Sequence, residues 1–185
     1  FKSSAKNNYE LIQNAIIKND ADLENVPDSV YERYFSERAV GDSFALPGYS
    51  TEFTIADFEK IVVRGCYPMT PVATYVLQNI SEKVAQNERT LFTFISKDEQ
   101  KSMVEFVKKN TINSIWAITP DLVYDYFSNL LKNERDEIKS VYRKSVVALD
   151  MAGIKYGSST LQIKILKALA LLLIVDRKQE LPWDK

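Results

Sequence analysis

Apolar residues recur every three to four positions along most of the chain, which is the period of an amphipathic α-helix. No alternating run long enough to predict a strand occurs, and no repeat of 20–50 residues is visible. The sequence therefore predicts an all-α fold, a helical bundle of about nine helices. The predicted helices cover 8–18, 29–40, 55–64, 71–85, a stretch after 87, 97–110, a stretch from 120, 134–152 and a final one ending at 175.

Capping residues and prolines mark where several of these helices begin. Thr54 is a predicted N-cap, and Thr70-Pro71 and Thr119-Pro120 each combine a capping hydroxyl with a proline at the first helical position. Ser96 and Glu99 have the spacing of a capping box, which predicts a helix start at 97. We also expect Gly153 and Gly157 to close the long helix, and Ser158 or Ser159 to cap the last one.

The stretch 41–53 contains two of the five glycines and a proline, so we expect a long loop there, which is a candidate boundary between parts of the chain. We predict three parts in all. An N-terminal helical segment and loop covers 1–50, a helical bundle covers 51–131, and 132–185 holds the long helix and the final helix.

Composition narrows the chemistry. The chain has 185 residues, a formal net charge of −1 and no histidine, which excludes imidazole catalysis and His-ligated metals. The single cysteine, Cys66, excludes internal disulfides and suits a reducing compartment, so we predict a buried structural thiol and a cytoplasmic location. The longest apolar run, 168–175, falls far short of the roughly 20 residues of a membrane span. We expect a buried helix there and no membrane partner.

Motifs for a stand-alone enzyme are missing. The five glycines form neither the phosphate-binding G-x-x-x-x-G-K-[ST] nor the nucleophile motif G-x-S-x-G. Asp121 and Asp125 are four residues apart, but we interpret Asp121 as an acid that complements a helix N-terminus and Asp125 as solvated. We therefore predict no catalytic site within this chain.

The segment Ala-Gln-Asn-Glu-Arg-Thr-Leu-Phe-Thr-Phe at 85–94 puts polar residues and an arginine between two strongly apolar helices. Arg89 lies at a predicted helix start, where a positive charge opposes the helix dipole. Its guanidinium is a fixed charged fork suited to phosphate or carboxylate. We therefore nominate Asn87, Glu88 and Arg89 as candidate residues for binding phosphate or carboxylate. The alternative is structural: Arg89 pairs with Glu88 or Glu82, and Asn87 only caps a helix.

The stretch 62–96, which includes Val-Val-Arg-Gly-Cys-Tyr-Pro-Met-Thr-Pro and the segment around Arg89, resembles part of large bacterial P-loop ATPases of the AAA+ type. The resemblance covers about 55–182 and is weak over 1–50. Where the family has Leu-His, this chain has Met69-Thr70. Thr70 keeps the capping role, and no chemical role of that histidine carries over.

The resemblance implies a lid-like bundle at 51–131 and the start of a winged-helix module at the final helix. Arg89 is then similar to the second sensor arginine, which reaches the γ-phosphate of ATP, so the resemblance implies that Asn87, Glu88 and Arg89 are nucleotide-sensing residues. The ATPase core, with ATP and Mg²⁺, would belong to the parent protein outside this chain, and this fragment alone would bind neither. We expect both ends of the chain to continue into that longer polypeptide.

Another class of function stays open: a stand-alone helical protein–protein interaction module with an apolar groove. It predicts an exposed apolar patch larger than about 400 Å². The candidate residues for that patch are Phe92, Phe94, Tyr124, Tyr126 and Phe127. Self-association also stays open. DNA binding draws only on the incomplete winged helix, and we expect none from this chain.

Overall fold

The computed structural model describes residues 5–17, 36–84, 88–110 and 117–176, with the backbone alone for residue 5 and residues 88–90. Across these ranges every regular element is a helix, and the only β-type pairing is a single bridge between Met69 and Ile118. The all-α prediction is confirmed. The predicted helix at 29–40 lies largely outside the described residues.

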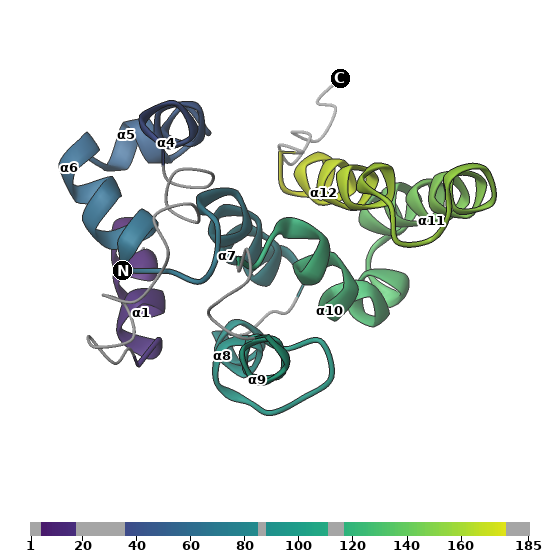
Figure 1. Cartoon of the computed structure of the whole chain (residues 1–185), viewed down its shortest axis with the longest axis horizontal. Coiled ribbons are helices and arrows are strands. Elements are labelled where there is room, and N and C mark those ends of the chain that lie inside the picture. Colours follow the sequence, from purple (N-terminus) through teal and green to yellow (C-terminus); the bar gives the residue numbers. More distant parts are fainter. Residues whose placement is uncertain (1–4, 18–35, 85–87, 111–116, 177–185) are drawn as a thin grey trace, which may run out of the picture.

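The described helices surround one central helix, α7 (Figure 1). In that view α1 and α4–α6 lie on one side of α7, α10–α12 lie on the other, and α8 and α9 lie below. The bounds are α1 (Ala5–Ala15), α4 (Glu37–Phe44), α5 (Tyr49–Glu52), α6 (Ile55–Phe58), the π-helical η1 (Glu59–Arg64), α7 (Pro71–Val84), α8 (Glu88–Ser96), α9 (Met103–Lys109), α10 (Pro120–Asn133), α11 (Asp136–Tyr156) and α12 (Leu161–Asp176).

Helix α7 is buried on almost every side. Ten of its 14 residues are buried, and it packs against α4, η1, α8, α10 and α12. Its start is capped as predicted, because Thr70 Oγ1 accepts a hydrogen bond from the backbone N–H of Ala73 at 3.2 Å. Backbone hydrogen bonds also join this turn to Ile118, which is far away in the sequence. The Thr70 N–H donates to the Ile118 carbonyl at 3.0 Å, and the Ile118 N–H donates to the Pro68 carbonyl at 2.8 Å.

A cluster of aromatic rings joins the N-terminal helices to α7. Tyr49 of α5 is fully buried, and its ring centroid lies 5.1 Å from that of Tyr9, 4.8 Å from that of Phe58 and 5.7 Å from that of Tyr75. The Tyr49 hydroxyl donates to the Pro71 carbonyl at 2.9 Å. Burial raises the pKa of both Tyr9 and Tyr49 above the ordinary tyrosine value. The cluster therefore combines side chains from the predicted N-terminal segment, 1–50, with side chains from the helices that follow it.

The junction between η1 and α7 also contains the only cysteine. Cys66 is fully buried, and its thiol donates to the Ile61 carbonyl at 3.3 Å. The prediction of a buried structural thiol is confirmed. The Thr54 cap of α6 is confirmed as well, because its hydroxyl oxygen accepts from the Asp57 N–H at 3.2 Å.

The expectation of a long loop at 41–53 is wrong. Helix α4 continues through Gly41 to Phe44, and α5 forms a further turn after Gly48, whose φ is +94°. The reason is aromatic burial. Phe44 packs on Phe58 with ring centroids 5.3 Å apart, and Tyr49 fills the core. The free energy of burying these rings exceeds the cost of about 1 kcal/mol for a glycine inside a helix.

The helix predicted to begin at 97 instead begins at Met103. Ser102 accepts from the Glu105 N–H at 3.2 Å, and Glu105 accepts from the Lys101 N–H at 2.6 Å. Two Ser-x-x-Glu matches occur close together, and the second one forms the cap. The residues before it make a turn in which Lys101 has a φ of +66°.

Three details of the C-terminal hairpin also differ from expectation. Gly153 lies inside α11, and Gly157, with a φ of +92°, ends it. At the start of α12 the first amide donors go to the Thr160 carbonyl, so neither predicted serine is the cap. The expectation that 168–175 is buried is wrong for one side, since Leu169 is 50% exposed and Leu173 is 61% exposed.

Gly65→Ala should destabilise the fold. A Cβ at Gly65 would lie 2.1 Å from the Ile61 carbonyl oxygen and 2.8 Å from Cδ of Gln13, so backbone or α1 has to move. We expect the free energy of unfolding in urea to fall by about 1–3 kcal/mol, as for other overpacked sites.

The matched control is Gly153→Ala in the interior of α11, where an added Cβ meets nothing within 4 Å. There alanine should raise stability by about 0.5–1 kcal/mol because it favours the helix. Equal effects of the two substitutions would contradict the close approach at Gly65.

Candidate functional site

The segment singled out from the sequence lies at the junction of α7 and α8. Helix α8 begins at Glu88, so Arg89 belongs to its first turn, and the predicted helix start at this point is confirmed. Asn87 lies outside the described residues, and the side chains of Glu88 and Arg89 are not described.

The rest of α8 is firmly packed. Leu91, Phe94 and Ile95 are buried, and the helix contacts α1, α7 and α9. The Phe94 ring meets that of Tyr126 edge-on, with centroids 5.0 Å apart. Because these buried residues follow directly after residue 90, they fix where the first turn of α8 lies.

Glu82 was one of two carboxylates considered as a local partner for Arg89. Its Oε1 accepts from the Gln78 amide at 2.6 Å and from the Asn8 amide at 3.2 Å. Glu82 therefore links α7 to α1, a role that its position in the sequence does not reveal. Both donors use Oε1, and a carboxylate has about four acceptor sites, so the structural alternative for Arg89 keeps both Glu82 and Glu88.

Lys83, in the last turn of α7, holds the end of α12. Its Nζ donates to the Ile174 carbonyl at 3.0 Å and to the Val175 carbonyl at 2.6 Å. These are carbonyls of the last helical turn, which have no partner within the helix and favour a positive charge. Sequence patterns contain no signal for this contact, because its partners lie 91 and 92 residues away.

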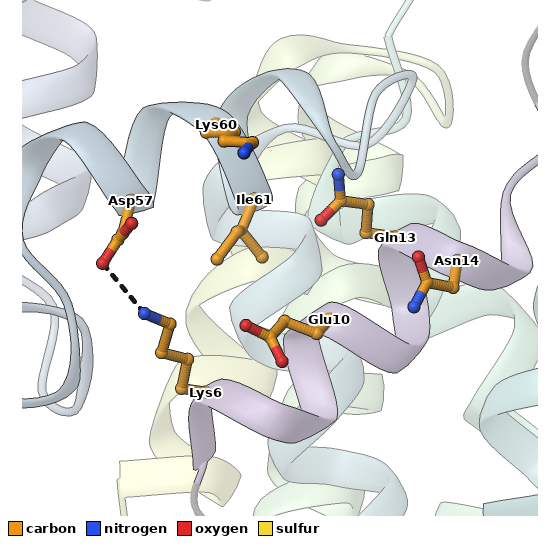
Figure 2. A pocket seen from close by; sticks show the side chains of 7 residues that line it. All are labelled: Lys6, Glu10, Gln13, Asn14, Asp57, Lys60 and Ile61. Carbon is orange, nitrogen blue, oxygen red and sulfur yellow. Dashed lines mark hydrogen bonds and ion pairs between the residues drawn. The ribbon is translucent and has the colours of Figure 1, made fainter.

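A polar groove of about 350 Å³ lies between α1 and the α6–η1 helix, and Figure 2 shows the side chains that line it. They are Lys6, Glu10, Gln13, Asn14, Asp57, Lys60 and Ile61. Lys6 Nζ and Asp57 Oδ2 are 2.8 Å apart. Their hydrogen bond lowers the pKa of Asp57 and raises that of Lys6. The groove mixes both signs of charge, and the ion pair across it joins the two helices.

The acids weighed as a catalytic pair have structural partners. Asp121 lies in the first turn of α10 and accepts a hydrogen bond from the Thr119 hydroxyl, while Asp125 accepts from Lys167 at 2.7 Å. Asp125, predicted to be solvated, is partly so: its side chain is 29% exposed and pairs with Lys167 of α12. Among the described residues no group of three or more His, Cys, Asp or Glu side chains could hold a metal ion.

The aromatic residues proposed as a docking patch belong mainly to the core. Phe94, Tyr124 and Phe127 are buried, and Phe92 and Tyr126 are partly buried against the core. The Tyr124 hydroxyl and Ser145 Oγ lie 2.8 Å apart, which joins α10 to α11. Desolvation together with the carboxylate of Glu99 raises the pKa of Tyr126 to about 12. Large apolar side chains are instead exposed on α11 and α12.

Comparison with known proteins yields no relative: no family model, curated protein or solved structure matches the chain. Of the helices that the structure describes, none combines the length and apolar character needed to cross a membrane.

Lys83→Met should loosen α12. The substitution keeps the aliphatic stem and removes two charge-assisted hydrogen bonds, so we expect a loss of about 1.5–3 kcal/mol in the free energy of unfolding. Hydrogen exchange should also become faster at the C-terminal turn of α12. Lys60→Met, at an exposed position of η1, is the control and should change neither measurement appreciably. Unchanged exchange in α12 would contradict the contact.

Asp57→Asn should lower the thermal midpoint near neutral pH by removing the ion pair with Lys6. Asp57 has a pKa below its ordinary value of 3.8 in the folded protein. Its contribution is therefore fully present above that value and is lost as pH falls through the lowered pKa. Wild type and variant should then converge in midpoint at acid pH. The control is Glu59→Gln, which removes an exposed carboxylate without an ion pair in the described part of the chain.

Proposed function

We propose that this chain is a non-catalytic helical part of an AAA+-like ATPase, in which Arg89 senses bound ATP and the bundle transmits the resulting movement. The observation that carries the proposal is the position of Arg89 in the first turn of α8, directly after the most buried helix of the fold. The resemblance of 62–96 to the lid region of such ATPases supports the same assignment.

The chemistry fits a triphosphate. An arginine in the first turn of a helix opposes the dipole, so its charge favours an external anion. Its planar fork forms paired hydrogen bonds to phosphate oxygens. Because the sequence has no phosphate-binding loop, ATP and Mg²⁺ would be held mainly by the core domain of the parent polypeptide. Asn87 and Glu88 would lie beside the phosphate as further polar groups.

Movement at this junction would reach α12. The junction is held on both sides, by buried Val84 at the end of α7 and by buried Leu91 in α8. Lys83, next to Val84, is bonded to the last carbonyls of α12. A pull on the arginine by nucleotide would therefore act on the end of α7 and, through Lys83, on the C-terminal hairpin. Under this proposal α12 is the first helix of a winged-helix-like module. The buried free cysteine, Cys66, fits a cytoplasmic location.

Arg89→Ala in the ATPase that contains this chain should reduce ATP turnover by roughly 10- to 100-fold, the equivalent of one charge-assisted hydrogen bond. The fold should be unchanged by circular dichroism. Arg89→Lys should recover only part of the activity, because it keeps the charge and loses the fork.

Arg38→Ala is the matched control. Arg38 is an arginine on α4 whose side chain is 92% exposed and which, within the described residues, pairs with Asp42 of the same helix. Turnover of that variant should match wild type. Wild-type turnover by Arg89→Ala would remove the sensor assignment.

A second function, a helical protein–protein interaction module, is favoured by a different observation. The apolar residues exposed on α11 and α12 form a surface that the described part of the chain leaves uncovered. The two proposals are compatible, because a bundle that transmits movement caused by ATP also needs a partner on which that movement acts.

A further inference from the structure

We propose that the exposed side of the α11–α12 hairpin binds an acidic amphipathic helix of a protein partner. The surface, called the hairpin face here, consists of two apolar stripes: Val147, Met151 and Ile154 on α11, and Leu161, Ile165, Leu169 and Leu173 on α12. These side chains are between 48% and 89% exposed. The inference rests on residues remote in sequence from Arg89.

The spacing within each stripe shows that its members share a side of the helix. On α12 the four residues follow one another at intervals of four, and on α11 the intervals are four and three. The opposite side of α12 is already used, since Leu171 and Ile174 are buried and the helix packs against α7, α10 and α11. The stripes are thus a second apolar surface.

Helix α12 has apolar residues on nearly its whole circumference. Such a helix is typical of the interior of a larger assembly, because an amphipathic helix at a protein surface carries polar residues on its outer side. Only Gln162 and Lys164 interrupt the exposed side of its first two turns. Isolated exposed leucines need no explanation, but stripes of this length mark sites of interaction.

The charge around the hairpin face indicates the sign of the charge on its partner. Across α11 and α12, residues 136–176, six basic residues outnumber four acidic ones (Asp136, Glu137, Asp150 and Asp176), whereas the whole chain has a net charge of −1. The basic residues are Lys139, Arg143, Lys144, Lys155, Lys164 and Lys167. Lys167 is engaged by Asp125, but Arg143, Lys144 and Lys164 are exposed and form no ion pair within the described residues.

These cations flank the stripes. Arg143 and Lys144 lie one turn before Val147 on α11, and Lys155 lies one turn beyond Met151. An acidic partner would meet complementary charge at the rim of the apolar surface, which favours association and fixes orientation. A helix with apolar anchors at i, i+3 or i+4, and i+7 matches the spacing of the stripes.

Two other occupants fit less well. A second copy of this chain would present the same cations to one another, which is unfavourable across an interface. Helices that lie in a membrane surface have low net hydrophobicity and a strongly charged side opposite the apolar one. Helix α12 instead has apolar residues on nearly its whole circumference, and its opposite side is buried against α7, α10 and α11.

The probe is an 18-residue helical peptide with leucines at i, i+3, i+4 and i+7 and glutamates along both flanks. The reference peptide replaces every glutamate by lysine. Fluorescence anisotropy with the whole chain should show the acidic peptide binding at least tenfold more tightly than the basic one. Its affinity should also fall as salt rises.

Substitutions then locate the site. Ile165→Gln with Leu169→Gln should weaken binding of the acidic peptide at least tenfold. Ile55→Gln is the matched control, because Ile55 is 49% exposed and Ile165 is 48% exposed. Arg143→Gln with Lys144→Gln provides a second test that spares the apolar residues, and it should remove most of the preference for the acidic peptide. Circular dichroism checks that each variant is folded.

Several results would overturn the proposal: equal binding of the two peptides, acidic binding unaffected by both double variants, or self-association abolished by the Ile165/Leu169 pair. Binding to vesicles of phosphatidylserine without binding to the peptide would assign the face to a membrane surface instead. Arg89→Ala should leave peptide binding unchanged, so failure here and failure of the ATP-sensing proposal are separate outcomes.

Discussion

Burial of α7 is the constraint on which the other helices depend. A helix with ten of its 14 residues buried needs neighbours on every side, and five other elements supply them. Its polar residues are accommodated locally: Thr74 donates to the Thr70 carbonyl at 3.2 Å, and Gln78 donates to Glu82. Ser81 Oγ is the one buried polar side-chain atom without a hydrogen-bond partner in the described part of the chain. The central position of α7 also puts its C-terminal turn beside both α8 and α12.

Much of the fold could be predicted because helix signals are local. The 3.6-residue period identified α1, α7 and α10, and the threonine cap before Pro71 forms with Thr70 as donor and acceptor. Local signals failed where tertiary packing decides. Glycines at 41 and 48 favour a loop, yet the packing of partly buried Phe44 and fully buried Tyr49 in the core stabilises helix there. The two Ser-x-x-Glu patterns, at 96–99 and 102–105, predict a helix start equally well from the sequence, and the packing of α9 decides between them.

The candidate site was predictable only in part. An arginine among polar residues between two apolar helices can be seen in the sequence, and the start of α8 at Glu88 agrees with it. The contacts that connect this junction to the rest of the protein could not be predicted. Lys83 donates to two carbonyls of α12. Nothing in the sequence relates these carbonyls to Lys83, because they lie 91 and 92 residues away. Likewise, a pattern shows which residues are apolar and not which of them are covered: Phe127, a candidate for the exposed patch, is buried, and Leu173, within the predicted buried run, is exposed.

Long-range ties at both ends of α7 have a consequence for how the protein unfolds. Tyr49 bonds to the start of the helix, and Lys83 joins its last turn to α12. Detaching either flank would expose aromatic rings or leave helix-terminal carbonyls unbonded. Partial opening is therefore expensive, and the N-terminal and C-terminal flanks should melt together with α7 as a single cooperative unit rather than one after the other.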